Sequence, residues 1–149
     1  MLDVRPVTED ELASVLPLIA AYQRFYGVAE PDDARNAGFF RRFIAPSDDG
    51  LLLGAWLDRE LAGHACLYWT FSSTAAREVV LLNDLFVVER HRGGGVGRAL
   101  IDATVDVAHS RGAGSVTWMT ALDNRTAQRL YESTGAARSA WFEYELELA

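Results

Sequence analysis

Residues 81–100 constrain the fold more than any other part of this sequence. Residues 81–88 are apolar except at Asn83 and Asp84, which predicts a buried strand. A glycine-rich loop follows, and apolar residues then recur at helical spacing: Val96, Ala99, Leu100, Ala103 and Val107. A strand, a glycine-rich loop and a helix N-terminus in this order favour anion binding, because the first turn of a helix carries backbone N–H groups without helical partners.

The loop residues indicate a phosphate as the anion. The glycines let a phosphate approach the backbone closely because they have no Cβ; they are Gly93, Gly94, Gly95 and Gly97. Arg92 and Arg98 flank them and can donate charge-assisted hydrogen bonds. Neither the P-loop signature nor the dinucleotide-binding signature fits these positions. The alternative is a glycine-rich turn that only starts a helix.

Two motifs in order resemble one enzyme family. The pattern Arg92-x-x-Gly95-x-Gly97 resembles the pyrophosphate loop of the GNAT superfamily of N-acetyltransferases. A second pattern, Asn-x-x-Ala-x-x-Leu-Tyr-x-x-x-Gly from Asn124 to Gly135, is similar to the second motif of that family. Taken alone, Asn124 would be a helix N-cap and Tyr131 a core aromatic residue. The resemblance covers nearly the whole chain.

The resemblance implies acetyl-CoA as cosubstrate and a set of residues that bind it. In that family the asparagine contacts the pantetheine arm or the acceptor side, and the tyrosine hydroxyl lies beside the thioester sulfur. The family also uses a strand that is splayed from its neighbour, and the resemblance implies that a backbone N–H near residues 86–88 stabilises the oxyanion here. The implied coenzyme site comprises Leu85, Phe86, Val87, Val88, Arg92, Gly93, Gly94, Gly95, Val96, Gly97, Arg98, Ala99, Asn124, Ala127 and Tyr131.

A finer resemblance concerns the acceptor. Residues 22–26, 31–33, 83–85, 118–120 and 127–131 look like the fungal histone/polyamine and D-amino-acid N-acetyltransferases. Diamine acetyltransferases are similar through the same strand and loop, but they carry glutamate where this chain has Asn83, which argues against their catalytic base here. Tyr22, Phe25, Tyr26 and Asn83 are the predicted acceptor-binding residues. Core packing is the alternative for the aromatic ones.

The reaction itself requires a base and an acid. An aliphatic ammonium has a pKa near ~10.4, so about one molecule in a thousand is nucleophilic at neutral pH. Asp84 is the best-placed carboxylate to remove its proton, and a structural carboxylate is the alternative. Tyr131 is protonated at pH 7 and can protonate the leaving thiolate. His64 is a second candidate base. Cys66 lies outside both motifs, so a buried apolar role is favoured over a nucleophile.

Composition places limits on the class of protein. A chain of 149 residues suits one domain, 1–149, and half of its residues are hydrophobic. One cysteine excludes an internal disulfide, and the histidines show no metal-ligand spacing. The net charge of −7 disfavours nucleic acid and favours a small cationic amine as partner. Without a leader-like N-terminus or a spanning apolar run, we expect a cytoplasmic protein that does not enter a membrane.

The remaining elements complete an α/β fold. We expect strands at 4–7, 51–57, 61–71, 78–88, 115–120 and 140–148. We expect helices after the capping box Thr8-x-x-Glu11, from Pro31, from Val96 and over residues 126–133. The order β-α-α-β-β-β-α-β-α-β predicts a mixed, mostly antiparallel sheet with helices on both faces, the acyl-CoA N-acyltransferase fold implied by the resemblance.

The last predicted strand also suggests an assembly. Residues 140–148 alternate between apolar and mostly acidic positions, as in a half-buried strand. Such a strand can pair with a second copy, so we expect a homodimer.

Three functional hypotheses follow from the sequence. The first is an acetyl-CoA-dependent N-acetyltransferase that acts on a primary amine by direct attack, with small amines, amino acids and polyamines favoured and protein amines possible. The second is a non-catalytic acyl-CoA-binding regulatory module of the same fold. The third is an unrelated phosphate-binding α/β domain. Tyr131 favours the first over the second, since a sensor needs no acid for a thiolate.

Overall fold

The computed structural model describes residues 1–149, which form two compact units, residues 1–119 and residues 120–149. The first unit holds five strands and three α-helices. Its strands are β1 (Leu2–Pro6), β2 (Gly50–Leu57), β3 (Glu60–Ser72), β4 (Arg77–Val87) and β5 (Ser115–Thr117). Its helices are α1 (Leu12–Phe25), α2 (Asp33–Phe40) and α3 (Val96–Ser110). None of the helices in the chain is long and apolar enough to cross a membrane.

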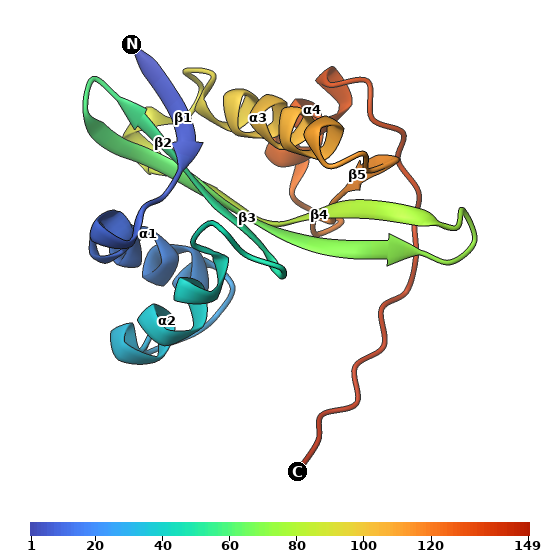
Figure 1. Ribbon diagram of the computed structural model, residues 1–149, viewed down its shortest axis with the longest axis horizontal. Helices are drawn as coiled ribbons and strands as arrows, with labels where there is room; N and C mark the ends of the chain where they lie inside the picture. The colour runs from blue at the N-terminus through green and yellow to red at the C-terminus, as the bar shows by residue number, and fades with distance from the viewer. The chain divides into compact units, whose positions relative to one another are not determined.

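The five strands form one sheet in the order β1-β2-β3-β4-β5. All neighbouring pairs are antiparallel except β4 and β5, which are parallel and are joined through α3. Helix α3 covers one face of this sheet, and α1 and α2 cover the other (Figure 1). The predicted fold class, a mixed and mostly antiparallel sheet between helices, is confirmed.

The core on the α1 side is built from the apolar stripe of that helix. Leu12, Val15 and Ile19 recur at helical spacing and are almost fully buried. They pack in one cluster with Leu52 of β2 and Cys66 of β3. Cys66 is therefore a buried core residue, as the sequence indicated. This packing fixes α1 against the middle of the sheet, and the same helix carries Tyr22 toward β4.

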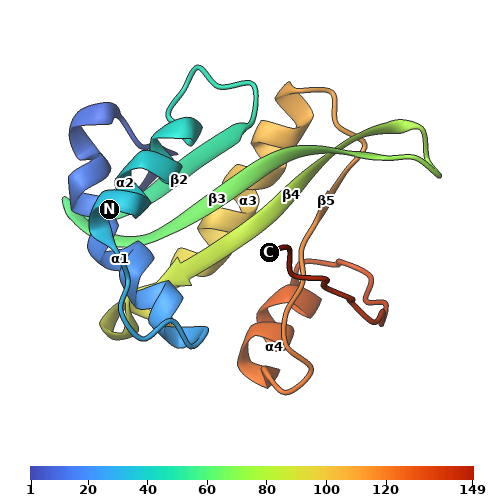
Figure 2. The same cartoon turned by 90° about the horizontal axis from the view of Figure 1, so that it is seen from below.

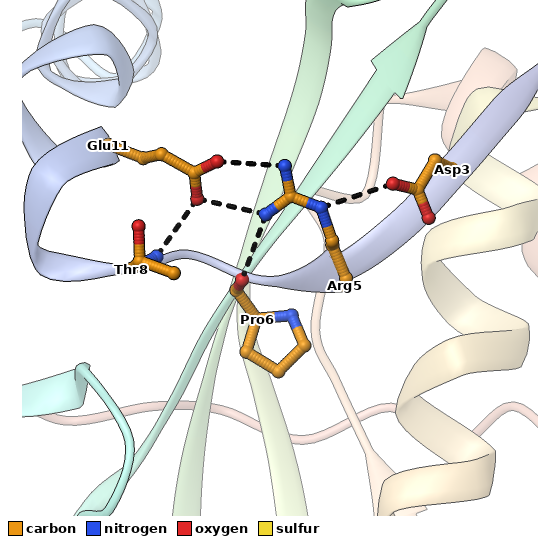
Figure 3. Close-up of polar contacts among 5 residues, drawn as sticks. All are labelled: Asp3, Arg5, Pro6, Thr8 and Glu11. Carbon is orange, nitrogen blue, oxygen red and sulfur yellow. Dashed lines mark hydrogen bonds and ion pairs between the residues drawn. The ribbon is translucent and has the colours of Figure 1, made fainter.

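The entry into α1 is held by a network around Glu11 (Figure 3). The Glu11 carboxylate accepts two hydrogen bonds from the Arg5 guanidinium, at 2.9 and 2.8 Å, and one from the Thr8 backbone N–H at 3.0 Å. The predicted capping box of Thr8 and Glu11 is present. These hydrogen bonds, foremost the one with Arg5, lower the pKa of Glu11 to about 2.

The second unit contains one helix, α4 (Arg125–Ser133), and no strand. The predicted strand over residues 140–148 is wrong, because these residues adopt no regular secondary structure and the apolar ones are exposed. An alternating pattern decides which side chains share a face, but a strand also needs a neighbour for its backbone hydrogen bonds. No strand of this chain supplies that neighbour, so the final β of the predicted order is absent.

We expect the Glu11 network to make stability depend on pH in the acid range. The lowered pKa means that Glu11 contributes stability above its unfolded pKa of 4.5 and loses it as the pH falls toward 2. Glu11→Gln should lower the free energy of unfolding by about 1 kcal/mol at pH 7, the usual cost of a lost cap. The difference from wild type should shrink between pH 4.5 and 2 in urea titrations.

The control variant for this test is Glu9→Gln. Glu9 forms an ion pair with Arg41 in which both side chains are more than half exposed, so its loss should change stability little. A difference between wild type and Glu11→Gln that stays constant over the acid range would contradict the role of the ionised Glu11.

Candidate functional site

The sheet opens in the middle of β4. The pairing of β3 with β4 runs from Leu67 opposite Leu82 to Cys66 opposite Asp84, so Asn83 is an extra residue in a β-bulge. The pairing of β4 with β5 ends at Leu81 and Thr117, whereas β4 continues to Val87. Strand β5 itself ends at Thr117, so β4 continues beyond it without a strand on that side (the strands are labelled in Figure 2). The backbone of β4 after the bulge thus has a strand partner on one side only.

Asp84 lies in β4 directly after this bulge. It is 5% exposed, and its Oδ1 accepts a hydrogen bond of 2.7 Å from the Asn83 side-chain amide. Burial raises the pKa of Asp84 from 3.8 to about 6, although the hydrogen bonds from Asn83 and Tyr22 partly offset this effect. A carboxylate with a pKa of about 6 is ionised at neutral pH and accepts a proton more readily than an ordinary aspartate.

The predicted acceptor residues lie in a row that begins at Asp84. Tyr22 reaches β4 from α1, where its hydroxyl donates to the Asn83 carbonyl at 3.4 Å. The Tyr26 ring lies 4.9 Å from the Tyr22 ring, and the Phe25 ring lies 5.2 Å from the Tyr26 ring. Phe25 and Tyr26 are more than half exposed, so core packing does not explain them. The row is therefore available to a ligand.

The predicted phosphate loop follows β4 within the same unit. Val88 donates its backbone N–H to Ala62 of β3, and the chain then enters a short 3₁₀ turn over Glu89–His91. Gly95 precedes α3 with a φ of 90°, in the left-handed region that side chains disfavour. A Cβ at Gly93 or Gly95 would meet nothing within 4 Å, so both glycines border open space. This geometry fits a phosphate group held against the backbone at the start of α3.

The two predicted arginines of the loop already have protein partners. Arg92 donates from Nε to the Val87 carbonyl at 2.9 Å, with its guanidinium 5.7 Å from the centre of the Phe86 ring. Arg98 donates from Nε to Asp102 at 3.0 Å, one turn along α3. These contacts hold both guanidinium groups in place beside the loop.

An acidic residue that the sequence analysis missed stabilises the turn before the loop. Glu60 begins β3, and its carboxylate forms an ion pair with Arg90 and lies 3.5 Å from Nε2 of His91. The contact joins residues 30 positions apart, so no local pattern signals it.

His64 is the other buried polar residue near Asp84. It is fully buried in β3, its ring centre lies 6.2 Å from that of Tyr22 and 6.0 Å from that of Phe86, and neither ring nitrogen has a hydrogen-bond partner. Burial lowers the pKa of His64 to about 4. A neutral imidazole of such low basicity is a poorer proton acceptor than Asp84.

The second family motif lies in the second unit. The Asn124 side chain accepts a hydrogen bond of 3.2 Å from the Ala127 backbone N–H, so it caps α4. Tyr131 lies in the same helix and is half-buried. Gln128, in the first turn of that helix, donates to the carbonyls of Ala121 and Leu122 at 3.0 Å.

Comparison with known proteins places the chain in a family. A model of the acetyltransferase (GNAT) family matches residues 15–136. An uncharacterized N-acetyltransferase of Bacillus subtilis, YhfO, is 33% identical over 141 residues, which are 95% of this chain and 93% of that protein. The D-amino-acid N-acetyltransferase HPA3 of Saccharomyces cerevisiae is 36% identical over 112 residues, 74% of this chain and 69% of that protein.

A solved structure agrees with these relatives. The crystal structure of a probable acetyltransferase has a TM-score of 0.85 and 27% sequence identity, and the match covers 99% of this chain and 98% of that one. The fold and the family match lead to one conclusion. The chain belongs to the acetyltransferase (GNAT) family and is an acyltransferase of the N-acetyltransferase type.

Proposed function

We propose that this enzyme transfers the acetyl group of acetyl-CoA to the primary amine of a small molecule by direct attack, with Asp84 as the base. The observation that carries the proposal is Asp84 itself, a buried carboxylate with a pKa raised to about 6 at the bulge where β4 separates from β5. Asp84 differs in this respect from Glu11, whose pKa is lowered by the hydrogen bonds that it accepts at the start of α1.

Acetyl-CoA supplies an activated acyl group, and the chain supplies its binding. The backbone N–H groups at the start of α3 and the arginines Arg92 and Arg98 would hold the pyrophosphate. The remaining predicted coenzyme contacts are Leu85, Phe86, Val87, Val88, Gly93, Gly94, Gly95, Val96, Gly97 and Ala99, together with Asn124, Ala127 and Tyr131. Backbone N–H groups of β4 beyond the bulge would donate to the thioester oxygen, since β5 does not pair with them.

The acceptor amine arrives as an ammonium and must lose a proton before it attacks. Asp84 would take this proton, directly or through water, while Tyr22 and Asn83 hold its carboxylate in place. Phe25 and Tyr26 would line the acceptor's path. Tyr131 would protonate the departing thiolate. Small amines, amino acids and polyamines are the acceptor classes that we propose, and the D-amino-acid specificity in the name of the yeast relative supports the second.

We infer that residues 1–149 act as one catalytic domain. The family match over residues 15–136 runs across the boundary between the two units and supports this inference. The alternative function is a non-catalytic acyl-CoA-binding module on the same fold, which would need the phosphate loop but not the raised pKa of Asp84.

The phosphate loop yields a test of coenzyme binding. Gly95→Val should raise the KM for acetyl-CoA at least tenfold, because valine disfavours the left-handed φ of 90° and its side chain would fill the space for the phosphate. Gly112→Val is the matched control, since Gly112 also has a positive φ, of 71°, and open surroundings but lies at the other end of α3. Equal coenzyme A affinity of both variants in calorimetry would contradict the loop assignment.

The base yields a test by pH. Because Asp84 must be ionised to accept a proton, kcat/KM for the amine should rise with pH through about 6. Asp84→Asn should lower kcat by about 10²- to 10⁴-fold and remove this acid limb. Tyr131→Phe should also lower kcat, but it should retain the acid limb and lose a limb at high pH instead. The pH profiles of wild type, Asp84→Asn and Tyr131→Phe are measured in a thiol-release assay with acetyl-CoA and a panel of amines.

The thermal stability of Asp84→Asn separates the two interpretations of this residue. A raised pKa means that the ionised Asp84 costs stability as the pH rises from 3.8 through about 6, so the variant should be at least as stable as wild type at pH 7. A marked loss of stability without a change in the pH profile would make Asp84 a structural carboxylate.

We also propose that the enzyme is a homodimer that uses its C-terminal segment. Trp141, Phe142, Tyr144, Leu146 and Leu148 are 85–91% exposed, and the alternating segment that carries them has an unpaired backbone. Pairing with a strand of a second copy would satisfy this backbone and bury these side chains. Light scattering at micromolar concentration should give twice the mass of the chain, and a chain that ends at Ser139 should be monomeric. An active monomer of the full chain would remove this proposal.

A further inference from the structure

The bulge in β4 brings two consecutive side chains together. In a regular strand, neighbouring side chains point to opposite faces of the sheet, so Asn83 and Asp84 would be separated. A bulge changes the direction of one of them. As a result, the side-chain Nδ2 of Asn83 donates to Oδ1 of Asp84 at 2.7 Å, which makes Asn83 a direct partner of the proposed base.

The same amide nitrogen has a second partner on β3. Asn83 Nδ2 also donates to the Tyr68 hydroxyl at 3.1 Å. A primary amide nitrogen carries two N–H groups, so the carboxylate of Asp84 and the phenol of Tyr68 use both of them. The Tyr68 ring is held by stacking on the buried Phe43, with the ring centres 5.2 Å apart. Tyr68 therefore fixes which end of the amide faces Asp84.

The Tyr68 hydroxyl is suited to either end of this amide. Its pKa is raised by burial and then by the negative charge of Asp84, so the phenol stays protonated. A protonated hydroxyl both accepts and donates hydrogen bonds. It accepts from the amide N–H in the orientation described above, and it would donate to the amide oxygen of Asn83 if the amide turned over.

The two orientations of the amide match the two charge states of Asp84. An ionised carboxylate only accepts hydrogen bonds, so it requires the N–H end, which faces it here. A protonated carboxyl group also donates, so it favours the carbonyl end. A half-turn of the amide exchanges its nitrogen and its oxygen in place. Asn83 thus keeps hydrogen bonds to Asp84 and Tyr68 in both charge states.

The other titratable groups that face Asp84 come from α1 and β3. Tyr22 reaches it from α1, and its hydrogen bond lowers the pKa of Asp84. On β3, Cys66 lies opposite Asp84 in the ladder, and His64 lies two residues before Cys66 on the same face. Burial raises the pKa of Cys66 and lowers that of His64 to about 4, so both are uncharged at neutral pH. Burial and hydrogen bonds therefore set the proton affinity of Asp84.

We propose that Tyr68 is a positioning residue for the base and that it acts through Asn83. It holds the N–H end of the amide on the ionised Asp84 before the reaction, and it supports the reversed amide once Asp84 is protonated. In that step an N–H bond of the acceptor ammonium breaks, its electron pair stays on nitrogen, and the proton forms an O–H bond at Asp84. The proton then leaves to water, and the amide turns back. This inference rests on the proposed role of Asp84 as the base.

Tyr68→Phe tests the inference by removing one oxygen, because the ring and its stacking on Phe43 remain. Without the phenol the amide presents either end, so the ionised Asp84 loses part of its hydrogen bond from Asn83. The pKa of Asp84 should rise above about 6, and the acid limb of kcat/KM should move to higher pH with it. The KM for acetyl-CoA should not change. NMR of the Asp84 carboxyl carbon measures this pKa independently of activity.

A double-mutant cycle determines whether Tyr68 acts through Asn83. Asn83→Leu should raise the pKa of Asp84 by about one pH unit or more, the value of a hydrogen bond to a charged group. The addition of Tyr68→Phe to that variant should raise the pKa no further. Thr70→Val is the matched control and should leave the pKa unchanged, since Thr70 also carries a hydroxyl on β3 but lies two residues farther from Asp84 along the ladder.

An unchanged Asp84 pKa in Tyr68→Phe, or an equal rise with and without Asn83, would overturn the inference. Either result would leave the proposed function intact as long as Asp84→Asn removes the acid limb of wild type. An acid limb that persists in Asp84→Asn would instead overturn the role of Asp84 as the base, even where Tyr68→Phe shifts the pKa of Asp84 in the NMR titration.

Discussion

The bulge at Asn83 is the constraint on which the candidate site depends. One extra residue in β4 shifts its register against β3 just beyond the point where pairing with β5 ends. The same residue uses its backbone carbonyl to hold Tyr22 and its side chain to hold Asp84 and Tyr68. The irregularity that opens the sheet therefore also organises the polar groups on its α1 side.

The buried polar side chains near the bulge lower the stability of the fold. Asp84 and His64 are both buried, one on β4 and the other on β3. Burial raises the pKa of Asp84 and lowers the pKa of His64, so it favours the uncharged form of each side chain. In addition, neither ring nitrogen of His64 has a hydrogen-bond partner. Such buried polar groups are tolerated where a hydrophobic core stabilises the remainder of the fold. In this protein, the core cluster that includes Ile19 and Leu52 does so.

The sequence predicted the elements whose signals are local. Strand β4, the loop and helix α3 follow one another within residues 77–110. The capping box and the N-cap at Asn124 each involve only four consecutive residues. The bulge at Asn83 and the contact of Glu60 with Arg90 could not be predicted, because each depends on segments that are distant in the chain. The strand over residues 140–148 failed for the same reason, since its pattern contains no information on a pairing partner.

The Arg5–Glu11 network gives the chain's first residues a remote influence on chemistry. It determines where α1 begins, and Tyr22 follows Glu11 by eleven residues, about 17 Å along the helix at ~1.5 Å per residue. Because α1 is packed rigidly on the sheet, a change in its starting point would move the Tyr22 hydroxyl relative to Asp84. A substitution at this half-buried ion pair would thus alter the proton affinity of a carboxylate that the pair never touches.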